Sequence, residues 1–354
     1  MKILVATDAW RPQVNGVVRT YERLREEAAP LDAEIIFLTP GEFSTVPCPT
    51  YPEIRLSLPG YSYIGQRMRE IEPDAVHIAT EGPLGWMTRS HCLRKGIPFT
   101  TSFHTRFPDY ISSRFNLPEG WIWSILRRFH NAGAGIMVAT PTLARELEER
   151  GFERTLSWTR GVDTEMFRPR DVRRFGDGPV YLYVGRVAIE KNIEAFLNAK
   201  LDGRKVVVGD GPQLQELRGR YPDVMFTGKR VGEDLAECYA SADVFVMPSK
   251  TETFGIVILE AMASGLPVAA YPVTGPIDLI APGETGVLSH DIAQAAREAL
   301  ALSRDEIRKR ALEYSWEAAA RLFVSNIESA LFANKGRNAP ARRVRLARRR
   351  PSQA

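Results

Sequence analysis

Short apolar runs alternate with amphipathic stretches along most of the chain, and this alternation predicts strands and helices in turn. The runs at 2–6, 75–79 and 135–139 are almost wholly apolar, which is typical of strands buried on both faces of a parallel sheet. Between such runs lie stretches of about ten to fifteen residues with helical spacing, for example 17–29 and 83–95. The pattern favours the α/β class, with helices on both faces of each sheet.

The alternation occurs twice, which predicts two domains. Residues 1–168 form a first unit and residues 179–303 a second, joined by a linker at 169–178 that is rich in Arg, Asp and Gly. A helical segment at 304–332 is expected to cross back to the first unit, and 333–354 to form a basic, disordered tail. Two consecutive units of similar size predict two Rossmann-like domains that face a cleft.

The bulk properties of the chain indicate a globular protein of a reducing compartment. With 354 residues, the chain is too long for one ordinary core. No apolar run approaches the ~20 residues that cross a membrane, and the first apolar run is too short for a signal peptide. The cysteines Cys48, Cys92 and Cys238 lie far apart and lack metal-site spacing. We therefore expect a cytoplasmic location and no metal.

The net charge of +4 conceals an uneven distribution. From Lys335 to Ala354 there are eight basic and no acidic side chains, which leaves 39 basic and 43 acidic residues in the rest of the chain. The folded part is therefore mildly acidic and carries a basic tail. Three interpretations of the tail stay open: attraction to anionic lipid, a solubilising segment, and weak affinity for RNA.

Two carboxylates bracket a predicted helix that follows the apolar run 244–247. Glu252 lies just before this helix, and Glu260 lies about two helical turns further on, so it shares a face with the helix start. The free N–H groups of the first turn favour an anion. A phosphate flanked by two acceptors for hydroxyl groups is the layout of a sugar nucleotide. An ordinary amphipathic helix with one capping and one solvated glutamate stays open as the alternative.

The predicted loops of the first unit hold further candidates in three places, because ligands of open parallel sheets bind at the carboxyl ends of strands. Asn15 and Gly16 precede a helix, where glycine lets a ligand approach the backbone. His104 is the histidine best placed to face a cleft. Arg160 and Asp163 lie shortly before the linker, where they either reach the cleft or order the hinge. The chain has neither a dinucleotide G-x-G-x-x-G fingerprint nor a P-loop lysine here.

The second unit supplies cations and a glycine turn. Gly185 and Arg186 end its first strand, and Lys191 follows before the next helix. An arginine and a lysine in these places form a clamp for phosphate. The turn Gly209-Asp210-Gly211 is either a tight βα turn or one wall of a nucleotide-base pocket. Together these loops suit a diphosphate joined to two polyols.

Taken in order, these motifs resemble those of family 4 glycosyltransferases, over about residues 1–330. The motifs are Asn15-Gly16, His104, Arg160-Gly161-Val162-Asp163, Gly185-Arg186 with Lys191-Asn192, Gly209-Asp210-Gly211-Pro212, and Glu252-Thr253-Phe254-Gly255 with Glu260. The resemblance implies a retaining enzyme of the GT-B fold. In that fold two Rossmann-like domains face a central cleft and a C-terminal helix crosses back to the first domain.

The resemblance also implies roles for the matching residues. Arg186 and Lys191 are expected to neutralise the donor diphosphate as the sugar leaves. Glu252 is expected to bind sugar hydroxyls, and Glu260 the ribose. His104 is expected near the sugar, with its backbone stabilising the developing oxocarbenium charge. These four catalytic candidates are His104, Glu252, Arg186 and Lys191. The expected donor-binding residues are Asn15, Gly16, Arg160, Gly185, Arg186, Lys191, Gly209, Asp210, Gly211, Glu252, Thr253, Phe254, Gly255 and Glu260.

The acceptor is expected from a different stretch. Residues 102–110 look like the corresponding stretch of bacterial glycosyltransferases that add sugars to diacylglycerol, and of related α-mannosyltransferases. The predicted helix around 121–128 sets aromatic beside basic residues, which indicates either a membrane-interface element or an ordinary buried amphipathic helix.

We therefore expect a retaining glycosyltransferase that moves a hexose or hexuronic acid from a UDP- or GDP-linked sugar to a lipid-linked acceptor such as diacylglycerol. It would need no cofactor or metal, because preplaced positive charge stabilises the leaving group. It would contact the inner face of the cytoplasmic membrane peripherally. Three alternatives stay open. They are a mannosyltransferase acting on a polysaccharide or lipopolysaccharide precursor, a GT-B-fold sugar-nucleotide epimerase, and a non-enzymatic nucleic-acid-binding protein that acts through the tail. The intact glutamate pair argues against an inactive scaffold, and nucleic acid is not an expected partner.

Overall fold

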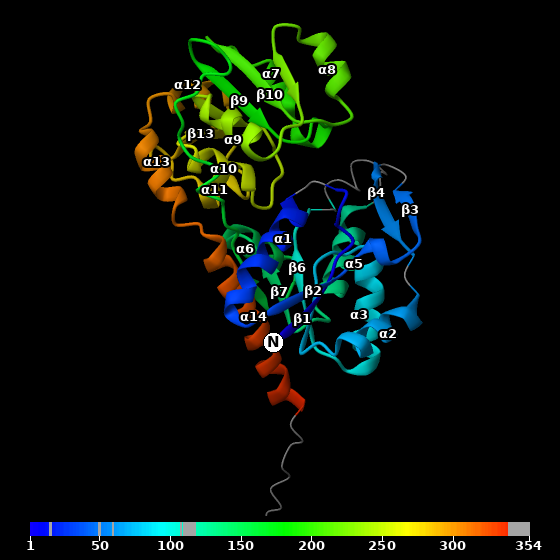
Figure 1. Cartoon of the computed structure of the whole chain (residues 1–354). Coiled ribbons are helices and arrows are strands. Elements are labelled where there is room, and N and C mark those ends of the chain that lie inside the picture. The colour runs from blue at the N-terminus through cyan, green and yellow to red at the C-terminus, as the bar shows by residue number, and fades with distance from the viewer. Residues whose placement is uncertain (14–15, 49–50, 59, 107, 109–117, 339–354) are drawn as a thin grey trace, which may run out of the picture.

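The computed structural model describes residues 1–13, 16–48, 51–58, 60–106, 108 and 118–338. Within this part, the chain forms two α/β domains stacked one above the other (Figure 1). Each domain is built on a six-stranded sheet in which every pair of neighbouring strands is parallel. The predicted fold class, two Rossmann-like units in succession, is confirmed.

The first sheet has the strand order β2-β1-β5-β6-β7-β8. Its strands are β1 (Lys2–Ala6), β2 (Glu34–Leu38), β5 (Ala75–Ile78), β6 (Phe99–Phe103), β7 (Gly135–Val138) and β8 (Thr155–Ser157). The helices of this domain are α1 (Gly16–Ala28), α2 (Tyr61–Ile71), α3 (Pro83–Lys95), α5 (Glu119–His130) and α6 (Pro141–Glu149). An antiparallel hairpin of β3 (Thr45–Cys48) and β4 (Tyr51–Ser57), which was not predicted, precedes α2.

Helix α3 shows how a distant residue and a local one can set the two ends of a helix. The Asp8 carboxylate accepts hydrogen bonds from the N–H groups of Leu84 and Gly85 at 2.9 and 3.1 Å. Asp8 therefore caps the start of α3 from the end of the neighbouring strand β1. The helix ends at Gly96, whose φ of +65° is left-handed and suits glycine.

The second sheet has the order β11-β10-β9-β12-β13-β14. Its strands are β9 (Val180–Val184), β10 (Arg204–Val208), β11 (Met225–Gly228), β12 (Val244–Met247), β13 (Val268–Ala270) and β14 (Gly286–Leu288). Its helices are α7 (Ile193–Leu197), α8 (Leu214–Arg220), α9 (Gly232–Ala240), α10 (Ile256–Ala263), α11 (Pro276–Leu279) and α12 (Ile292–Ala299).

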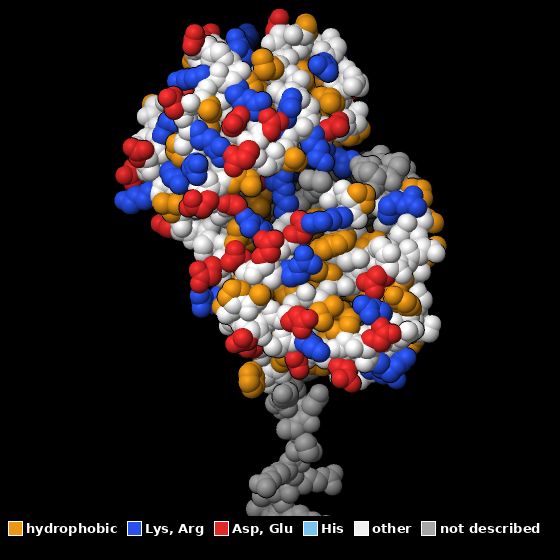
Figure 2. Space-filling model, in the orientation of Figure 1, with side chains coloured by type: hydrophobic (Ala, Val, Ile, Leu, Met, Phe, Trp, Pro, Cys, Tyr) orange, Lys and Arg blue, Asp and Glu red, His pale blue; other side chains and the backbone are white. Residues whose placement is uncertain are grey.

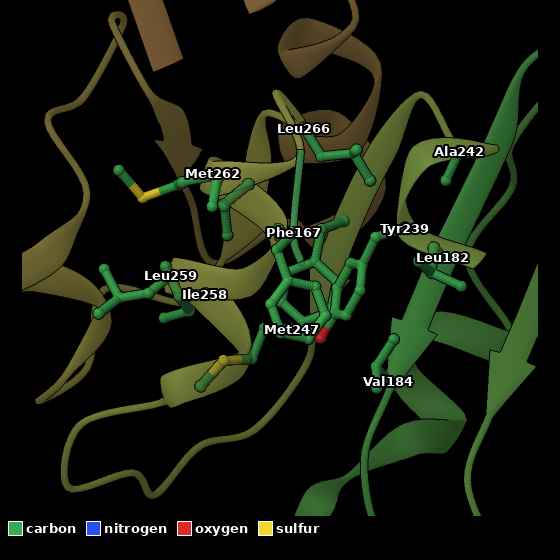
Figure 3. Packing of buried hydrophobic residues seen from close by; sticks show 14 of the residues in the cluster. Phe167, Leu182, Val184, Tyr239, Ala242, Met247, Ile258, Leu259, Met262 and Leu266 are labelled. Atoms are coloured by element: carbon green, nitrogen blue, oxygen red, sulfur yellow. The ribbon is translucent and has the colours of Figure 1, made fainter. Parts of the chain in front are cut away.

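Residues on both sides of the predicted linker contribute to the second core. Phe167 packs there against Tyr239, with the ring centroids 5.6 Å apart, close to Leu182 and Met247 (Figure 3). The chain therefore enters the core of the second domain before the predicted linker at 169–178. The limits of the two domains stay a prediction.

The C-terminal helices return the chain to the first domain. α13 (Arg304–Ala311) packs on α10 of the second domain, whereas α14 (Trp316–Asn338) lies along α1 and covers one face of the first sheet (Figure 1). The crossing back is thus confirmed, but it is made by two helices. The predicted start of the tail at 333 is wrong, because α14 continues to Asn338. The rest of the predicted tail lies outside the described residues.

The chain passes between the two domains twice, near residue 162 and near residue 314, and these two segments touch each other. The N–H of Val162 donates to the carbonyl of Tyr314 at 3.0 Å. A Cβ added to Gly161 would lie 2.3 Å from the backbone nitrogen of Trp316, so only glycine fits at this position. The passages form one hinge between the two sheets.

Candidate active site

The carboxyl ends of the two sheets face each other, and polar contacts join them. Each contact links a first-domain residue to a second-domain residue: His104 O to Thr253 Oγ1 at 2.7 Å, Arg19 Nη1 to Glu260 Oε1 at 3.0 Å, and Thr142 N to Asp278 Oδ1 at 3.1 Å. Lys and Arg side chains gather along the hollow between the domains (Figure 2). The loops that were predicted to face one cleft therefore meet.

Two helix N-termini converge in this cleft. α1 begins at Gly16 and α10 at Ile256, and a Cβ added to Gly16 would lie 3.9 Å from Ile256 Cγ2. The free N–H groups of two first turns therefore lie near each other and attract an anion. Gly255 precedes α10 with a φ of +87°, which glycine adopts without strain. Asn15, an expected donor-binding residue, lies outside the described residues.

Glu252 is held as a charged carboxylate by its neighbours. Lys191 Nζ lies 2.9 Å from Oε2, and the N–H of Thr253 donates to Oε1 at 3.0 Å. Burial raises the pKa of Glu252, but the Lys191 charge and the hydrogen bonds outweigh it, so the pKa lies below its ordinary value. At neutral pH Glu252 is therefore a pure acceptor, as binding of sugar hydroxyls requires. Its contact with a sugar stays a prediction.

Gly275, which the sequence analysis missed, supports the loop that carries Glu252. Its φ is +92°, and an added Cβ would lie 2.9 Å from the carbonyl oxygen of Phe254 and 3.3 Å from Glu252 Cγ. A larger residue would displace both donor-binding candidates. The available signal was the sequence Thr274-Gly275-Pro276, which follows strand β13 at the carboxyl end of the sheet.

Glu260 is 3% exposed and already has two donors. Tyr239 Oη donates to Oε2 at 2.9 Å, and Arg19 pairs with Oε1. Burial raises the pKa of Glu260 above its ordinary value, more than Arg19 and Tyr239 lower it. A ribose would share the carboxylate with these donors, since each oxygen can accept two hydrogen bonds. Ribose binding stays a prediction, and Arg19 is a neighbour that sequence reasoning missed.

The two cations predicted to clamp a diphosphate have different surroundings. Lys191 is paired with Glu252, whereas Arg186 Nε lies 3.9 Å from Glu190 Oε1. Both side chains are partly exposed, so a ligand in the cleft can reach them. Their contact with a diphosphate stays a prediction.

The glycines beside Arg186 allow two loops to touch. A Cβ on Gly209 would lie 1.8 Å from the carbonyl oxygen of Gly185, and a Cβ on Gly211 would lie 2.3 Å from that of Val187. The carboxylate of Asp210 accepts from the N–H of Gly211 at 2.7 Å. The segment is therefore a tight βα turn packed on the loop after β9. Its role in a base pocket stays a prediction.

The ring of His104 forms hydrogen bonds with two side chains of the first domain. Arg160 Nη2 donates to Nδ1 at 3.0 Å, and Nε2 lies 3.1 Å from Tyr21 Oη. Arg160 is 5% exposed, and burial lowers its pKa to about 10. The structure thus places Arg160 against His104, while its expected contact with the donor stays a prediction. Tyr21 was missed because a tyrosine in the apolar stripe of a helix indicates only core packing.

The sequence left open whether Asp163 reaches the cleft or orders the hinge, and the structure places it at the hinge. It forms an ion pair with Arg23 of α1, and its Oδ1 accepts from the N–H of Met166 at 3.0 Å.

The stretch expected to contact the acceptor is described only in part. Ser102 belongs to a buried hydrogen-bond network, and Arg106 pairs with Glu146 of α6. Phe107, Asp109 and Tyr110 lie outside the described residues. In the described part of the chain, no cluster of three His, Cys, Asp or Glu side chains could hold a metal. No helix described here has the length and apolar character needed to cross a bilayer.

Both halves of the chain match known protein families in sequence. Residues 14–166 match the family described as Glycosyltransferase Family 4, and residues 178–305 match that described as Glycosyl transferases group 1. The GDP-mannose-dependent alpha-mannosyltransferase of Mycobacterium tuberculosis is 33% identical over 319 residues, which cover 81% of this chain and 83% of that protein. The alpha-monoglucosyldiacylglycerol synthase of Streptococcus pneumoniae is 27% identical over 91% of this chain and 83% of its own.

A solved structure agrees in fold. Sucrose-phosphate synthase from Thermosynechococcus elongatus superposes with a TM-score of 0.74 at 21% identity, over 94% of this chain and 99% of that one.

Proposed function

The chain belongs to glycosyltransferase family 4, with the GT-B fold, and we propose on that basis that it transfers a hexose or hexuronic acid from a nucleotide diphosphate sugar to a lipid-linked acceptor with retention of configuration. One observation carries most of the proposal: Glu252, paired with Lys191, lies beside the contact between Thr253 and His104 O, where the two domains meet. Such a place offers positive charge for a diphosphate and acceptors for sugar hydroxyls.

The proposed reaction breaks the bond between the anomeric carbon and a phosphate oxygen, which keeps the electron pair. Arg186 and Lys191 stabilise the charge of the leaving diphosphate, together with the N-termini of α1 and α10. The acceptor hydroxyl attacks the same face of the carbon, and its proton passes to the leaving phosphate oxygen. Because these cations supply the positive charge, we propose that no metal is required. Closure of the domains excludes water.

For the acceptor, we propose diacylglycerol. The proposal is supported by the similarity to a protein named alpha-monoglucosyldiacylglycerol synthase. The similarity to a GDP-mannose-dependent alpha-mannosyltransferase supports a second candidate, transfer of mannose to a polysaccharide or lipopolysaccharide precursor.

The nucleotide is expected to reveal itself by thermal stabilisation. UDP, GDP and ADP are each added over a range of concentrations. At a concentration about 1,000 times its Kd, the diphosphate that the site binds is expected to add about 4 kcal/mol to the free energy of unfolding. Thermal unfolding of the intact chain measures this. Incubation with the matching nucleotide sugar alone is expected to yield no isomerised sugar nucleotide. An isomer formed without acceptor would favour the epimerase, and the absence of any stabilisation would contradict the proposed site.

We also propose that the enzyme contacts an anionic membrane surface from the cytoplasmic side, through α3 and α5. Trp121 and Ile125 of α5 are 72% and 53% exposed. Arg89 Nη2 of α3 donates to the carbonyl of Arg128 at 2.8 Å, so the two helices are adjacent. Their basic residues are Arg89, Arg94, Lys95, Arg127 and Arg128, against the single acid Glu119. This is a basic surface on a mildly acidic body, which favours anionic lipid.

The double variant Trp121→Ser with Ile125→Ser is expected to bind vesicles several-fold more weakly, because two exposed apolar side chains are lost. Sedimentation with phosphatidylcholine vesicles that contain phosphatidylglycerol measures this. Leu300→Ser with Leu312→Ser, exposed apolar positions of the second half of the chain, is the matched control. Equal vesicle binding by both variants would contradict the proposed membrane surface.

Removal of residues 335–354 is expected to leave sugar transfer intact. If sugar transfer were lost, a function that depends on the tail would be favoured instead.

A further inference from the structure

Both ring nitrogens of His104 are occupied by groups of its own domain. Arg160 approaches Nδ1 and Tyr21 approaches Nε2. Because a guanidinium can only donate, Nδ1 must accept, so the ring proton lies on Nε2 and is donated to Tyr21 Oη. The ring is therefore neutral and has one defined tautomer.

The hydrogen bonds continue away from the cleft into the first sheet. Tyr21 Oη lies 2.9 Å from His77 Nε2 and 3.2 Å from Ser102 Oγ. His77 Nδ1 lies 2.8 Å from Thr100 Oγ1. Since Tyr21 Oη accepts a hydrogen bond from His104 Nε2–H, the hydroxyl of Tyr21 donates its own hydrogen bond to His77 or Ser102. The network is buried and ties the His104 ring to strands β5 and β6.

The guanidinium of Arg160 is held in place by several contacts besides the one with His104. Its Nη1 donates to the carbonyl oxygens of Trp158 and Thr159 at 2.7 and 3.2 Å, and its guanidinium lies 3.9 Å from the centroid of the Trp158 ring. Trp158 in turn donates from Nε1 to the carbonyl of Ala319 on α14 at 3.0 Å. In the described part of the chain no carboxylate forms an ion pair with Arg160. A buried cation without such a partner is costly, which points to a functional reason for its position.

The carbonyl of His104 is the group that meets the second domain. It accepts from Thr253 Oγ1 at 2.7 Å, and Thr253 follows Glu252 directly. The hydrogen bonds of the ring fix the position of His104, and its carbonyl oxygen lies beside the residues that we assign to donor binding.

We propose that Arg160 and Tyr21 are positioning residues for sugar transfer, which hold the His104 ring neutral and turned inward so that its carbonyl oxygen faces the donor loop. This inference rests on the proposed function. The carbonyl dipole is then aimed at the region where positive charge develops on the sugar, and a neutral ring adds no opposing charge.

Charges around His104 agree with a neutral ring. Burial, Arg160 and the neighbouring His77 and His130 lower the pKa of His104 well below its ordinary value. Arg160, His77, His130 and Tyr21 are the titratable groups that face it, and burial lowers the pKa of His77 to about 3, so His77 is neutral as well. Burial is the largest of these causes and remains when Arg160 is replaced by an apolar side chain, so the ring is expected to stay neutral, while Nδ1 loses the donor that fixes its tautomer.

Three variants test the inference on the intact chain. Tyr21→Phe is expected to lower kcat about ten-fold with the donor KM within about two-fold, because the ring loses one anchor but the donor contacts remain. Arg160→Met is expected to lower kcat further, because Nδ1 of the ring loses the donor that fixes its tautomer. Arg160→Lys, which keeps a charged donor, is expected to restore most of the rate. Tyr63→Phe on α2 is the control, because its hydroxyl lies 3.4 Å from Glu42 in another part of the domain.

A second readout needs no turnover. In histidine-labelled protein, the ring-nitrogen NMR signals of His104 are expected to show the tautomer protonated at Nε2 in the unchanged chain and to lose that single tautomer in Arg160→Met, where Nδ1 has no donor. If that variant does not fold, Tyr21→Phe and Arg160→Lys carry the test through their kcat and KM. An unaltered kcat in Tyr21→Phe, a loss through KM alone, or a His104 that keeps the same single tautomer in a folded Arg160→Met would overturn the inference. Absence of sugar transfer by the unchanged chain would instead contradict the proposed function.

Discussion

Replacing Glu252 with glutamine is expected to lower turnover by about 10²-fold to 10³-fold while the Kd for the nucleoside diphosphate changes only a few-fold. Glutamine keeps the shape of the side chain but removes its charge and turns one acceptor oxygen into a donor. The carboxylate accepts from Lys191 and from the N–H of Thr253, so it is well placed to orient hydroxyl groups beside them. Initial rates with saturating donor, and calorimetric titration with the diphosphate, measure the two effects.

The control for this substitution is Glu216→Gln on α8. Glu216 is 58% exposed and pairs with Arg220 on the surface of the same domain, so its loss is expected to change neither quantity. Turnover of Glu252→Gln close to that of the unchanged enzyme would show that Glu252 does not contact the sugar.

Replacing Lys191 with methionine is expected to weaken diphosphate binding by about ten-fold to a hundred-fold, as for the loss of one hydrogen bond to a charged group. It is also expected to move the acid limb of the kcat/KM profile to higher pH. Lys191 helps to keep the pKa of Glu252 below its ordinary value, against burial, which raises it. Without the lysine, burial prevails, and Glu252 loses its charge at a higher pH as the solution is acidified.

Lys205→Met is the matched control for this prediction. Lys205 lies in the same domain, and its amine donates to the carbonyl of Leu197 rather than to a carboxylate. Its replacement is expected to leave the acid limb and the diphosphate affinity unchanged. An unshifted acid limb in Lys191→Met would mean that the ion pair does not control the charge of Glu252.

Much of the fold could be predicted because its strands are buried on both faces. The run at 244–247 matches β12, and that at 180–184 matches β9, since parallel strands of this kind read as continuous apolar segments. Once those strands are placed, parallel sheets put the loops at a common edge, which is why Glu252 and Lys191 could be grouped before the structure was known.

Elements without that signal were missed. The hairpin β3–β4 holds Pro47 and Pro52, and proline argues against a strand except at edges and bulges. α14 runs past the predicted end to Asn338 although Gly336 and two asparagines there are poor helix formers, because a helix that is already formed gains a backbone hydrogen bond with each added residue. Composition indicated disorder there, but extension of an existing helix does not require a buried face.

Partners across the cleft could not be predicted from spacing. Arg19 lies on α1 and Glu260 on α10, so only the relative placement of the two domains brings the pair to 3.0 Å. The same holds for Thr253 and His104. Arg160 differs, because its sequence position favours a ligand contact, whereas packing within the first domain sets its guanidinium against the His104 ring. Motif reading identified the residues, while tertiary packing decided which of their atoms face the cleft.

The most direct test of the account is transfer of label from a radioactive nucleotide sugar to lipid. The intact chain is incubated with UDP-linked and GDP-linked hexoses and hexuronic acids in turn, with diacylglycerol vesicles and with EDTA present throughout. The account predicts that one donor passes label into the organic phase, with release of one equivalent of nucleoside diphosphate and an unchanged anomeric configuration in the product. An inverted configuration, a strict need for a metal, or no transfer of label from any of these donors would contradict it.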